Sequence, residues 1–241
     1  DFLEKEDSLE KVIDLLKNNP DSFIIVNRTR RNFDLSKVIT DNWMKLDPAK
    51  NYPFNSLKNF TLTWGLISII GFISVNIFDR EKFLNVDDKK YYGTMYPQLG
   101  MMMEAFHNSP CILIGEPLIC HRTETQEEKR AALGNKATEK DFMSDAQLRD
   151  SKYFSYPFIK TLNHLINSKV YNYEEIIKIP ECTVINGLLI DFLIKNLHLS
   201  NSFNHKWQIK HLEISDHFFS NLPLNKCQRH EYNLATAKRC V

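Results

Sequence analysis

Residues 8–27, SLEKVIDLLKNNPDSFIIVN, decide the fold class of this chain. The first half predicts an amphipathic helix, because apolar residues recur at the spacing of one helix face: Leu9, Val12, Ile13 and Leu16. The polar run 18–21, Asn-Asn-Pro-Asp, ends that helix. Residues 22–27 then read as a short buried parallel strand. A helix, a tight turn and a buried strand together indicate an α/β unit.

The pattern continues less regularly beyond this unit. Residues 28–62 are polar and contain two prolines, so we expect a long loop with short helices. The apolar run 63–78 is rich in β-branched and aromatic residues and favours a strand over a core helix. A helix is expected within 91–107, followed by strands at 111–115 and 117–122.

The second half of the chain has a different periodicity. Residues 151–199 show mostly the apolar spacing of helices, and no internal repeat is visible. We therefore expect an α/β domain over residues 1–140 and a helical extension over residues 141–241.

Composition excludes several classes of protein. The chain has 241 residues but only 7 glycines, and their spacing matches neither a P-loop nor a dinucleotide-binding turn. The net charge of +1 gives no strong field toward nucleic acid, so no nucleic-acid partner is expected. Five widely spaced cysteines without a C-x-x-C pair indicate a reducing compartment rather than a disulfide framework or a zinc ribbon.

The run 63–78 is also the strongest candidate for a membrane segment. It has 16 residues and includes polar side chains, whereas a membrane-spanning helix needs about 20 mostly apolar residues. We expect a buried element of the core instead. The expected location is the cytoplasm, with a peripheral position at the inner face of the plasma membrane left open.

The pair His121-Arg122 is the first candidate site. It follows an apolar run, where strands of α/β sheets present functional residues. Histidine can bind a divalent metal or act as a base, and arginine matches phosphate oxygens with two parallel donors. The alternative is that both residues only cap the strand and pair with Glu116 or Glu124.

Further candidates are charged residues near the predicted strands. Arg28, Arg30 and Arg31 cluster after the run 22–27 and could contact a phosphorylated ligand, or could lie in a solvated loop. Asp1 could bind Mg²⁺ or Mn²⁺ if other carboxylates joined it, and is otherwise an ordinary solvated residue. The adjacent pair Asp87-Asp88 fits a surface loop better than a shared site.

Four stretches resemble family 2 glycosyltransferases of bacterial O-antigen and capsule synthesis. Residues 1–16 resemble the segment that follows the Asp-x-Asp motif of that family. Residues 71–80 and 92–99 are similar to its later acceptor-side segments, and residues 117–122 resemble the closing strand. The resemblance covers roughly residues 1–125.

The resemblance implies the C-terminal portion of a GT-A, Rossmann-like domain, with the first part of that domain upstream of Asp1. It implies transfer of a sugar, with inversion, from a UDP-, GDP- or CDP-sugar to a glycan or a lipid-linked acceptor. Mg²⁺ or Mn²⁺ would stabilise the charge that develops on the nucleoside diphosphate leaving group.

Specific roles follow from the resemblance. Asp1 matches the last aspartate of the Asp-x-Asp motif and would be a metal ligand. His121 matches a region where some members place a further metal ligand, and Arg122 would face the diphosphate.

The catalytic base departs from the family pattern. The family places an acidic pair near the start of the helix at 92–106, but this sequence has none there. Asp87, Asp88 and Glu104 are the nearby substitutes, and we assign the base to Asp88.

A non-catalytic role is the alternative function. In that case the helical half would dock a protein partner or a membrane surface. The amphipathic stretch Val184–Leu197 and the aromatic cluster Tyr153–Phe158 motivate this alternative.

Overall fold

The computed structural model describes most of the first 123 residues and part of the remainder. The described residues are 2–32, 34–66, 73–94, 96–123, 152–180, 182, 217, 218, 220–224, 226, 229 and 230. Contacts divide the chain into two compact units. The sheet unit comprises Asp1–Phe60, Ser68–Val86 and Ala105–Ser144, and the helical unit comprises Thr61–Ile67, Asp87–Glu104 and Asp145–Val241. The boundary predicted at residue 140 lies outside the described residues and stays a prediction.

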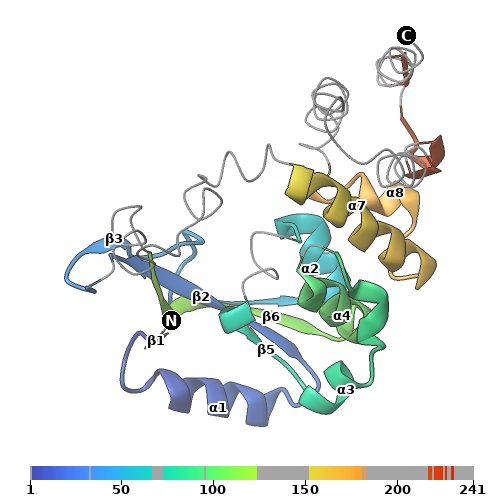
Figure 1. Cartoon of the computed structure of the whole chain (residues 1–241). Helices are drawn as coiled ribbons and strands as arrows, with labels where there is room; N and C mark the ends of the chain where they lie inside the picture. Colours follow the sequence, from blue (N-terminus) through green and yellow to red (C-terminus); the bar gives the residue numbers. More distant parts are fainter. Residues whose placement is uncertain are drawn as a thin grey trace. The chain divides into compact units, whose positions relative to one another are not determined.

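The sheet unit is built on one mixed sheet. Its strands among the described residues are β1 (Phe2–Leu3), β2 (Phe23–Arg31), β3 (Val38–Thr40), β4 (Asn51–Phe54), β5 (Asn76–Ile77) and β6 (Cys111–Arg122). The order is β1-β6-β2-β3, with β4 paired to β6 and β5 paired to β2. The long strands β2 and β6 lie side by side and parallel, and the other pairings are antiparallel (Figure 1). The predicted α/β class is confirmed.

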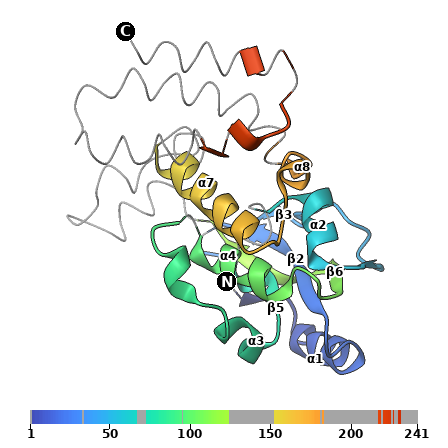
Figure 2. The ribbon, with the colours of Figure 1, turned by 90° about the vertical axis from the view of Figure 1, so that its right-hand side faces the viewer.

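Helix α1 (Ser8–Asn18) covers one face of this sheet, as Figures 1 and 2 show. The contact consists of apolar residues from the helix and from the two parallel strands: Val12, Leu15, Leu16, Ile24, Val26, Ile114 and Leu118. The predicted helix, turn and strand are thus confirmed. The helix face is rotated from the predicted one, because Leu9 and Ile13 are exposed.

Strand β2 is longer than predicted. Its hydrophobic run ends at Val26, but its backbone continues to pair with β6 and β3 as far as Arg31. The predicted long loop at 28–62 is therefore wrong. That region contains the end of β2, strands β3 and β4, and helix α2 (Leu57–Trp64). The sequence pattern did not indicate these strands, because their residues are mostly polar and backbone pairing does not require apolar side chains.

The run 63–78 does not form a single strand. Thr63 and Trp64 end helix α2, a 3₁₀ turn η1 spans Ile73–Val75, and only Asn76–Ile77 form a strand. Residues 67–72 lie outside the described residues. Conversely, the two strands predicted at 111–115 and 117–122 are one irregular strand, β6. Helix α3 (Arg80–Leu84) follows β5.

Helices make up the described part of the helical unit. They include the end of α2, η2 (Asp88–Tyr91), most of α4 (Pro97–Phe106), α7 (Lys152–Asn167) and α8 (Tyr173–Ile176). The helices predicted within 91–107 and at the start of 151–199 are confirmed there. Among the described residues, none of the helices combines the length and the apolar character that crossing a membrane requires.

A close approach fixes the packing of η2 on α4. The ring of Tyr91 is fully buried and passes over Gly100, where an added Cβ would lie 2.1 Å from a ring carbon. The Tyr91 hydroxyl donates a hydrogen bond of 2.6 Å to Glu104. Ser168, in the turn that follows α7, donates to the same carboxylate at 3.2 Å, so one acidic side chain joins η2, α4 and this turn.

Candidate functional site

The carboxyl ends of the two parallel strands carry most of the charged residues that the sequence singles out. In the register of β2 and β6, Arg30 lies opposite His121, and Arg31 lies opposite Arg122. Arg28 precedes them on β2. Functional groups of α/β sheets gather at this edge, so we built the candidate site from these strand ends.

A connecting segment passes over these strand ends. Residues 41–50, here called the crossing segment, link β3 to β4. Asn27 of β2 anchors the crossing segment, because its Nδ2 donates to the Oδ1 of Asn42 at 2.7 Å. The backbone N–H of Met44 donates to the Oδ1 of Asn27 at 3.2 Å. Trp43 lies between these two anchors, so its position depends on them.

The regular alternation of side chains in β2 is interrupted at Asn27. The pairing with β6 shifts register on both sides of this residue. Asn27 contacts Asn42, and the next residue, Arg28, contacts Trp43. Two consecutive side chains thus face the crossing segment, whereas a regular strand would direct them to opposite faces. The interruption brings Arg28 and Arg30 to the same face as Asn27.

We call the group Arg28, Arg30, Trp43 and His121 the Trp43 face. The guanidinium carbons of Arg28 and Arg30 each lie 4.9 Å from the centre of the Trp43 ring, within the range of cation–π contacts. Burial and the charge of Arg30 lower the pKa of Arg28 to about 10, so Arg28 is still cationic at neutral pH. Burial, then the charges of Arg28 and Arg30, lower the pKa of His121 to about 4.

This combination can bind an anion. Guanidinium groups donate paired hydrogen bonds to phosphate or carboxylate oxygens, and an aromatic ring orients them. His121 is neutral at pH 7, so its imidazole can donate one hydrogen bond and accept another. Bringing an anion next to Arg28 also relieves the cost of holding two like charges close together in a partly buried place.

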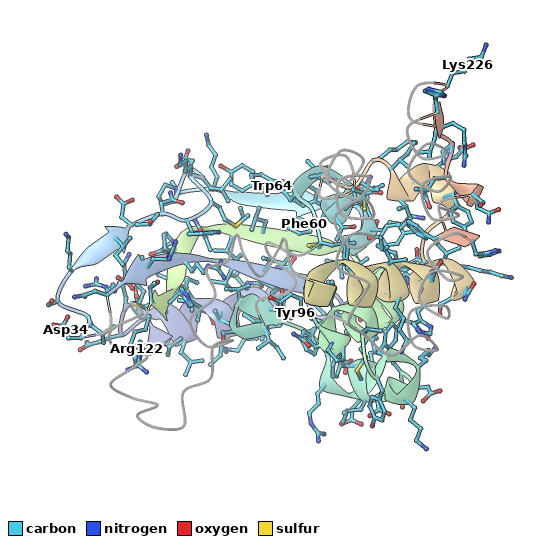
Figure 3. The ribbon with its side chains drawn as sticks, turned by 45° about the horizontal axis from the view of Figure 1, so that its top comes forward. Asp34, Phe60, Trp64, Tyr96, Arg122 and Lys226 are labelled. Atoms are coloured by element: carbon cyan, nitrogen blue, oxygen red, sulfur yellow. The ribbon has the colours of Figure 1, made fainter. Side chains whose placement is uncertain are left out.

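We call the residues on the opposite side of the strand ends the Glu4 face. Glu4 accepts hydrogen bonds from the Thr29 hydroxyl at 2.6 Å and from Arg31 at 2.8 Å. Arg122 is the register partner of Arg31, and its guanidinium carbon lies 5.9 Å from the Phe2 ring centre. Figure 3 shows Arg122 at the end of the sheet. The charges of Glu4 and Arg31 are therefore matched within the fold.

The structure separates His121 from Arg122, which the sequence placed in one site. Successive residues of a strand point to opposite faces, so His121 belongs to the Trp43 face and Arg122 to the Glu4 face. Asp1 lies outside the described residues.

A divalent metal ion does not fit the described residues on their own. Nowhere in the described part of the chain do three His, Cys, Asp or Glu side chains gather closely enough to hold a metal ion. His121 is neutral and could act as a ligand, but two guanidinium groups flank it. The predicted site for Mg²⁺ or Mn²⁺ depends on Asp1 and stays a prediction.

Asp88, the residue assigned as the base, belongs to the helical unit. It is exposed at the start of η2, and its Oδ2 accepts a hydrogen bond of 2.9 Å from the Tyr92 hydroxyl. The neighbouring Asp87 caps η2 by accepting from the backbone N–H of Lys89. The two carboxylates therefore have separate local partners.

Glu104 is engaged in the packing of its unit. Burial alone would raise its pKa, but hydrogen bonds from Lys90 and Tyr91 outweigh burial and lower it. A carboxylate whose charge is so well matched is a weak proton acceptor. Among the substitutes for the base, Asp88 is exposed, whereas Glu104 is partly buried in the packing of its unit.

The two segments that motivated a non-catalytic module lie mostly outside the described residues, so this alternative stays a prediction. The stretch Val184–Leu197 lies outside the described residues. Of the aromatic cluster Tyr153–Phe158, the described side chain is Phe158, and it is buried.

Sequence reasoning missed Trp43 and Asn27. The spacing Arg-x-Arg directly after a buried strand was a usable signal, because it places two charges on one face if the strand continues. Trp43 comes from a separate segment, and its spacing from the arginines in the sequence carries no such signal.

Comparison of the chain with models of protein families, with curated proteins and with solved structures found no significant match.

Proposed function

We propose that this chain is part of a glycosyltransferase with a GT-A, Rossmann-like fold that transfers a sugar from a nucleotide-sugar donor. The acceptor is a glycan or a lipid-linked sugar of a bacterial surface polysaccharide. The observation that carries the proposal is the Trp43 face, where two arginines, a tryptophan and a neutral histidine meet at the carboxyl ends of parallel strands. The resemblance of residues 1–125 to family 2 glycosyltransferases supports it.

The diphosphate of the donor is the ligand that we assign to the Trp43 face. Glycosyl transfer leaves a nucleoside diphosphate, whose negative charge increases as the bond to the sugar breaks. Arg28 and Arg30 are held by Trp43, so their guanidinium groups stabilise this charge without reorganising. Arg122, assigned to the diphosphate from the resemblance, is on the other face and is replaced in this role by Arg28 and Arg30.

His121 completes the face as a hydrogen-bonding group. Because its pKa is about 4, it adds no positive charge near pH 7 and can donate to a phosphate oxygen or accept from a ligand hydroxyl. A contribution of Mg²⁺ or Mn²⁺ together with Asp1 and His121 remains a separate prediction. Asp88 remains the proposed base that removes the proton from the acceptor hydroxyl.

Binding of nucleoside diphosphates tests the proposal. Titration calorimetry with UDP, GDP, CDP and inorganic pyrophosphate is expected to show binding that weakens as salt is added. The substitution Arg30→Met is expected to reduce the affinity at least tenfold, about 1.4 kcal/mol. Release of the nucleoside diphosphate from UDP-, GDP- and CDP-sugars, followed with Mn²⁺ or with EDTA, then tests donor use and metal dependence.

Arg122→Met is the matched control. It removes an arginine from the same end of the sheet but from the other face, and the affinity for diphosphates is expected to stay within about twofold of the original. Equal losses in Arg30→Met and Arg122→Met would contradict the assignment to the Trp43 face. Absence of diphosphate binding to the unaltered chain would contradict the proposed function.

A further inference from the structure

We propose that Asn27 is a positioning residue: it holds Trp43 and Arg28 in place on the Trp43 face and so sets how strongly this face binds an anion. The positioning itself rests on the geometry of the sheet unit. The identity of the anion, a diphosphate, rests on the proposed function.

The side-chain amide of Asn27 uses its full hydrogen-bonding capacity. Asn27 is fully buried. Its Nδ2 donates to Asn42 at 2.7 Å and to the carbonyl oxygen of Gly115 at 2.8 Å. Its Oδ1 accepts from the backbone N–H groups of Arg28 at 2.8 Å and Met44 at 3.2 Å. An asparagine has two donors and two acceptor sites on its amide, and all four are satisfied here.

These four bonds join three separate stretches of chain. Gly115 belongs to β6, Arg28 to β2, and Asn42 and Met44 to the crossing segment. The amide therefore fixes the crossing segment relative to the parallel strand pair. Because side-chain bonds within a buried network depend on one another, loss of this amide disturbs all three stretches.

Trp43 is placed by the two residues beside it. Asn42 is held by Asn27 and closes a local turn, since its Nδ2 donates to the Leu46 carbonyl oxygen at 2.6 Å. Met44 is held through its backbone N–H. Trp43 adds a hydrogen bond of its own: its backbone N–H donates to the backbone carbonyl oxygen of Arg28 at 2.9 Å. Trp43 as a residue is 37% exposed, so it is held through its backbone while remaining open to solvent.

Arg28 is placed by the same amide. The backbone N–H of Arg28 donates to the Oδ1 of Asn27 at the point where the pairing of β2 with β6 changes register. This bond stabilises the irregularity that lets Arg28 follow Asn27 onto the same face. Asn27 therefore acts on binding through Trp43 and Arg28 and does not itself contact the ligand.

Aspartate at this position tests the need for an amide. It has the same size but cannot donate, so its carboxylate would face the oxygens of Gly115 and Asn42 that now accept hydrogen bonds. Alanine removes all four bonds. Both variants are expected to release the crossing segment. Because aspartate keeps the volume of asparagine, release in Asn27→Asp would show that the hydrogen bonds, and not the volume, are required.

Fluorescence of Trp43 reports the positioning without any ligand. In a Trp64→Phe, Trp207→Phe background, Trp43 is the remaining tryptophan. Iodide is attracted to the two guanidinium groups, whereas acrylamide is neutral. We expect the ratio of iodide to acrylamide quenching to fall at least twofold in Asn27→Ala and Asn27→Asp. Affinity for inorganic pyrophosphate, measured by calorimetry, is expected to fall at least fivefold in the same variants.

Asn42→Ala keeps the experiment decisive if the Asn27 variants do not fold. Asn42 is less buried, and its loss leaves the bond between Asn27 and Gly115 intact. The same two changes are expected. Asn19→Ala is the control. The Asn19 side chain donates to the carbonyl oxygen of Leu15 in α1, away from the crossing segment, so neither readout should change.

The two readouts separate the possible failures. Folded Asn27 and Asn42 variants that keep the original quenching ratio would overturn the positioning role. A lower ratio with unchanged pyrophosphate affinity would overturn the link from positioning to binding. If the unaltered chain binds no pyrophosphate, the proposed function fails, and the quenching ratio still decides whether Asn27 places Trp43 beside the two guanidinium groups.

Discussion

The two faces at the end of the parallel strands use the same residue types for different purposes. On the Glu4 face, Arg31 pairs with a carboxylate that also accepts from Thr29. On the Trp43 face, Arg28 and Arg30 share an aromatic ring. The first arrangement satisfies its charges inside the fold and ties β1 to the sheet. The second collects positive charge beside a ring that solvent can reach.

The difference shows that neighbouring arginines in one sequence cluster need separate explanations. Arg30 and Arg31 are adjacent in the chain, but their faces and partners differ. Substituting one arginine of β2 on each face therefore gives a paired experiment, because the strand and the residue type are the same and the positions are close in sequence.

The largest effect is expected from Gly115→Ala, which would displace the crossing segment that carries Trp43. An added Cβ would lie 2.2 Å from the Asp47 carbonyl oxygen and 2.5 Å from that of Lys50, both backbone atoms of the crossing segment. Relief requires the segment to move, at a cost of about 1–3 kcal/mol of stability. Urea denaturation measures the cost, and Trp43 quenching measures the movement. An unchanged midpoint would contradict the close packing at Gly115.

The next largest effect is expected from Arg28→Met, compared with Arg31→Met. Loss of Arg28 should weaken pyrophosphate binding at least tenfold, about 1.4 kcal/mol. Loss of Arg31 should leave binding within about twofold and instead lower stability, because Glu4 loses its charged partner. Calorimetry and thermal unfolding separate the two. Weaker binding in both variants would mean that the faces do not act independently.

A smaller, pH-dependent effect is expected from Glu4→Gln. Burial alone would raise the Glu4 pKa, but hydrogen bonds from Arg31 and Thr29 outweigh burial and lower it. Its ionised form therefore stabilises the fold above the unfolded pKa, about 4.5, and this contribution is lost as the pH falls through the lower folded pKa. At pH 7 the variant should lose about 1 kcal/mol. Urea unfolding at pH 7 and pH 3 tests this, since the difference between variant and original should shrink at pH 3.

The smallest effect at neutral pH is expected from His121→Gln. The folded pKa of about 4 lies below the ordinary histidine pKa of 6.5, so between these pH values the unfolded chain binds the extra proton. Stability should therefore rise as the pH increases from about 4 to about 6.5, and the glutamine variant should lose this part of the slope. Thermal unfolding across that pH range measures it. Parallel pH profiles for variant and original would contradict burial of the neutral imidazole.

Part of the fold could be predicted from the sequence because one physical signal dominated it. Apolar spacing identified α1 and the start of β2, where burial decides the structure. The end of β2 escaped because its pairing with β6 and β3 rests on backbone hydrogen bonds, which leave no mark on the residues from Arg28 to Arg31.

The candidate site was predicted less well for two reasons. The sequence singled out His121 together with Arg122, but the alternation of β6 places the two side chains on opposite faces. Trp43 reaches the site through a segment that crosses the sheet, held by hydrogen bonds from the buried Asn27. Such a contact depends on tertiary structure and has no local pattern in the sequence.

Because of the register irregularity, the number of residues in β6 determines which of its side chains face Trp43. Twelve residues of β6 span the same pairing as nine residues of β2. If Glu116 were removed and the backbone path of β6 stayed the same, every later residue would move back by one pairing position. Arg122 would lie opposite Arg30 and His121 opposite Thr29, and each side chain would face the other way. Arg122 would then turn toward Trp43, and His121 toward Glu4. A one-residue deletion, with no change in composition at the site, would thus exchange an imidazole for a guanidinium on the anion-binding side.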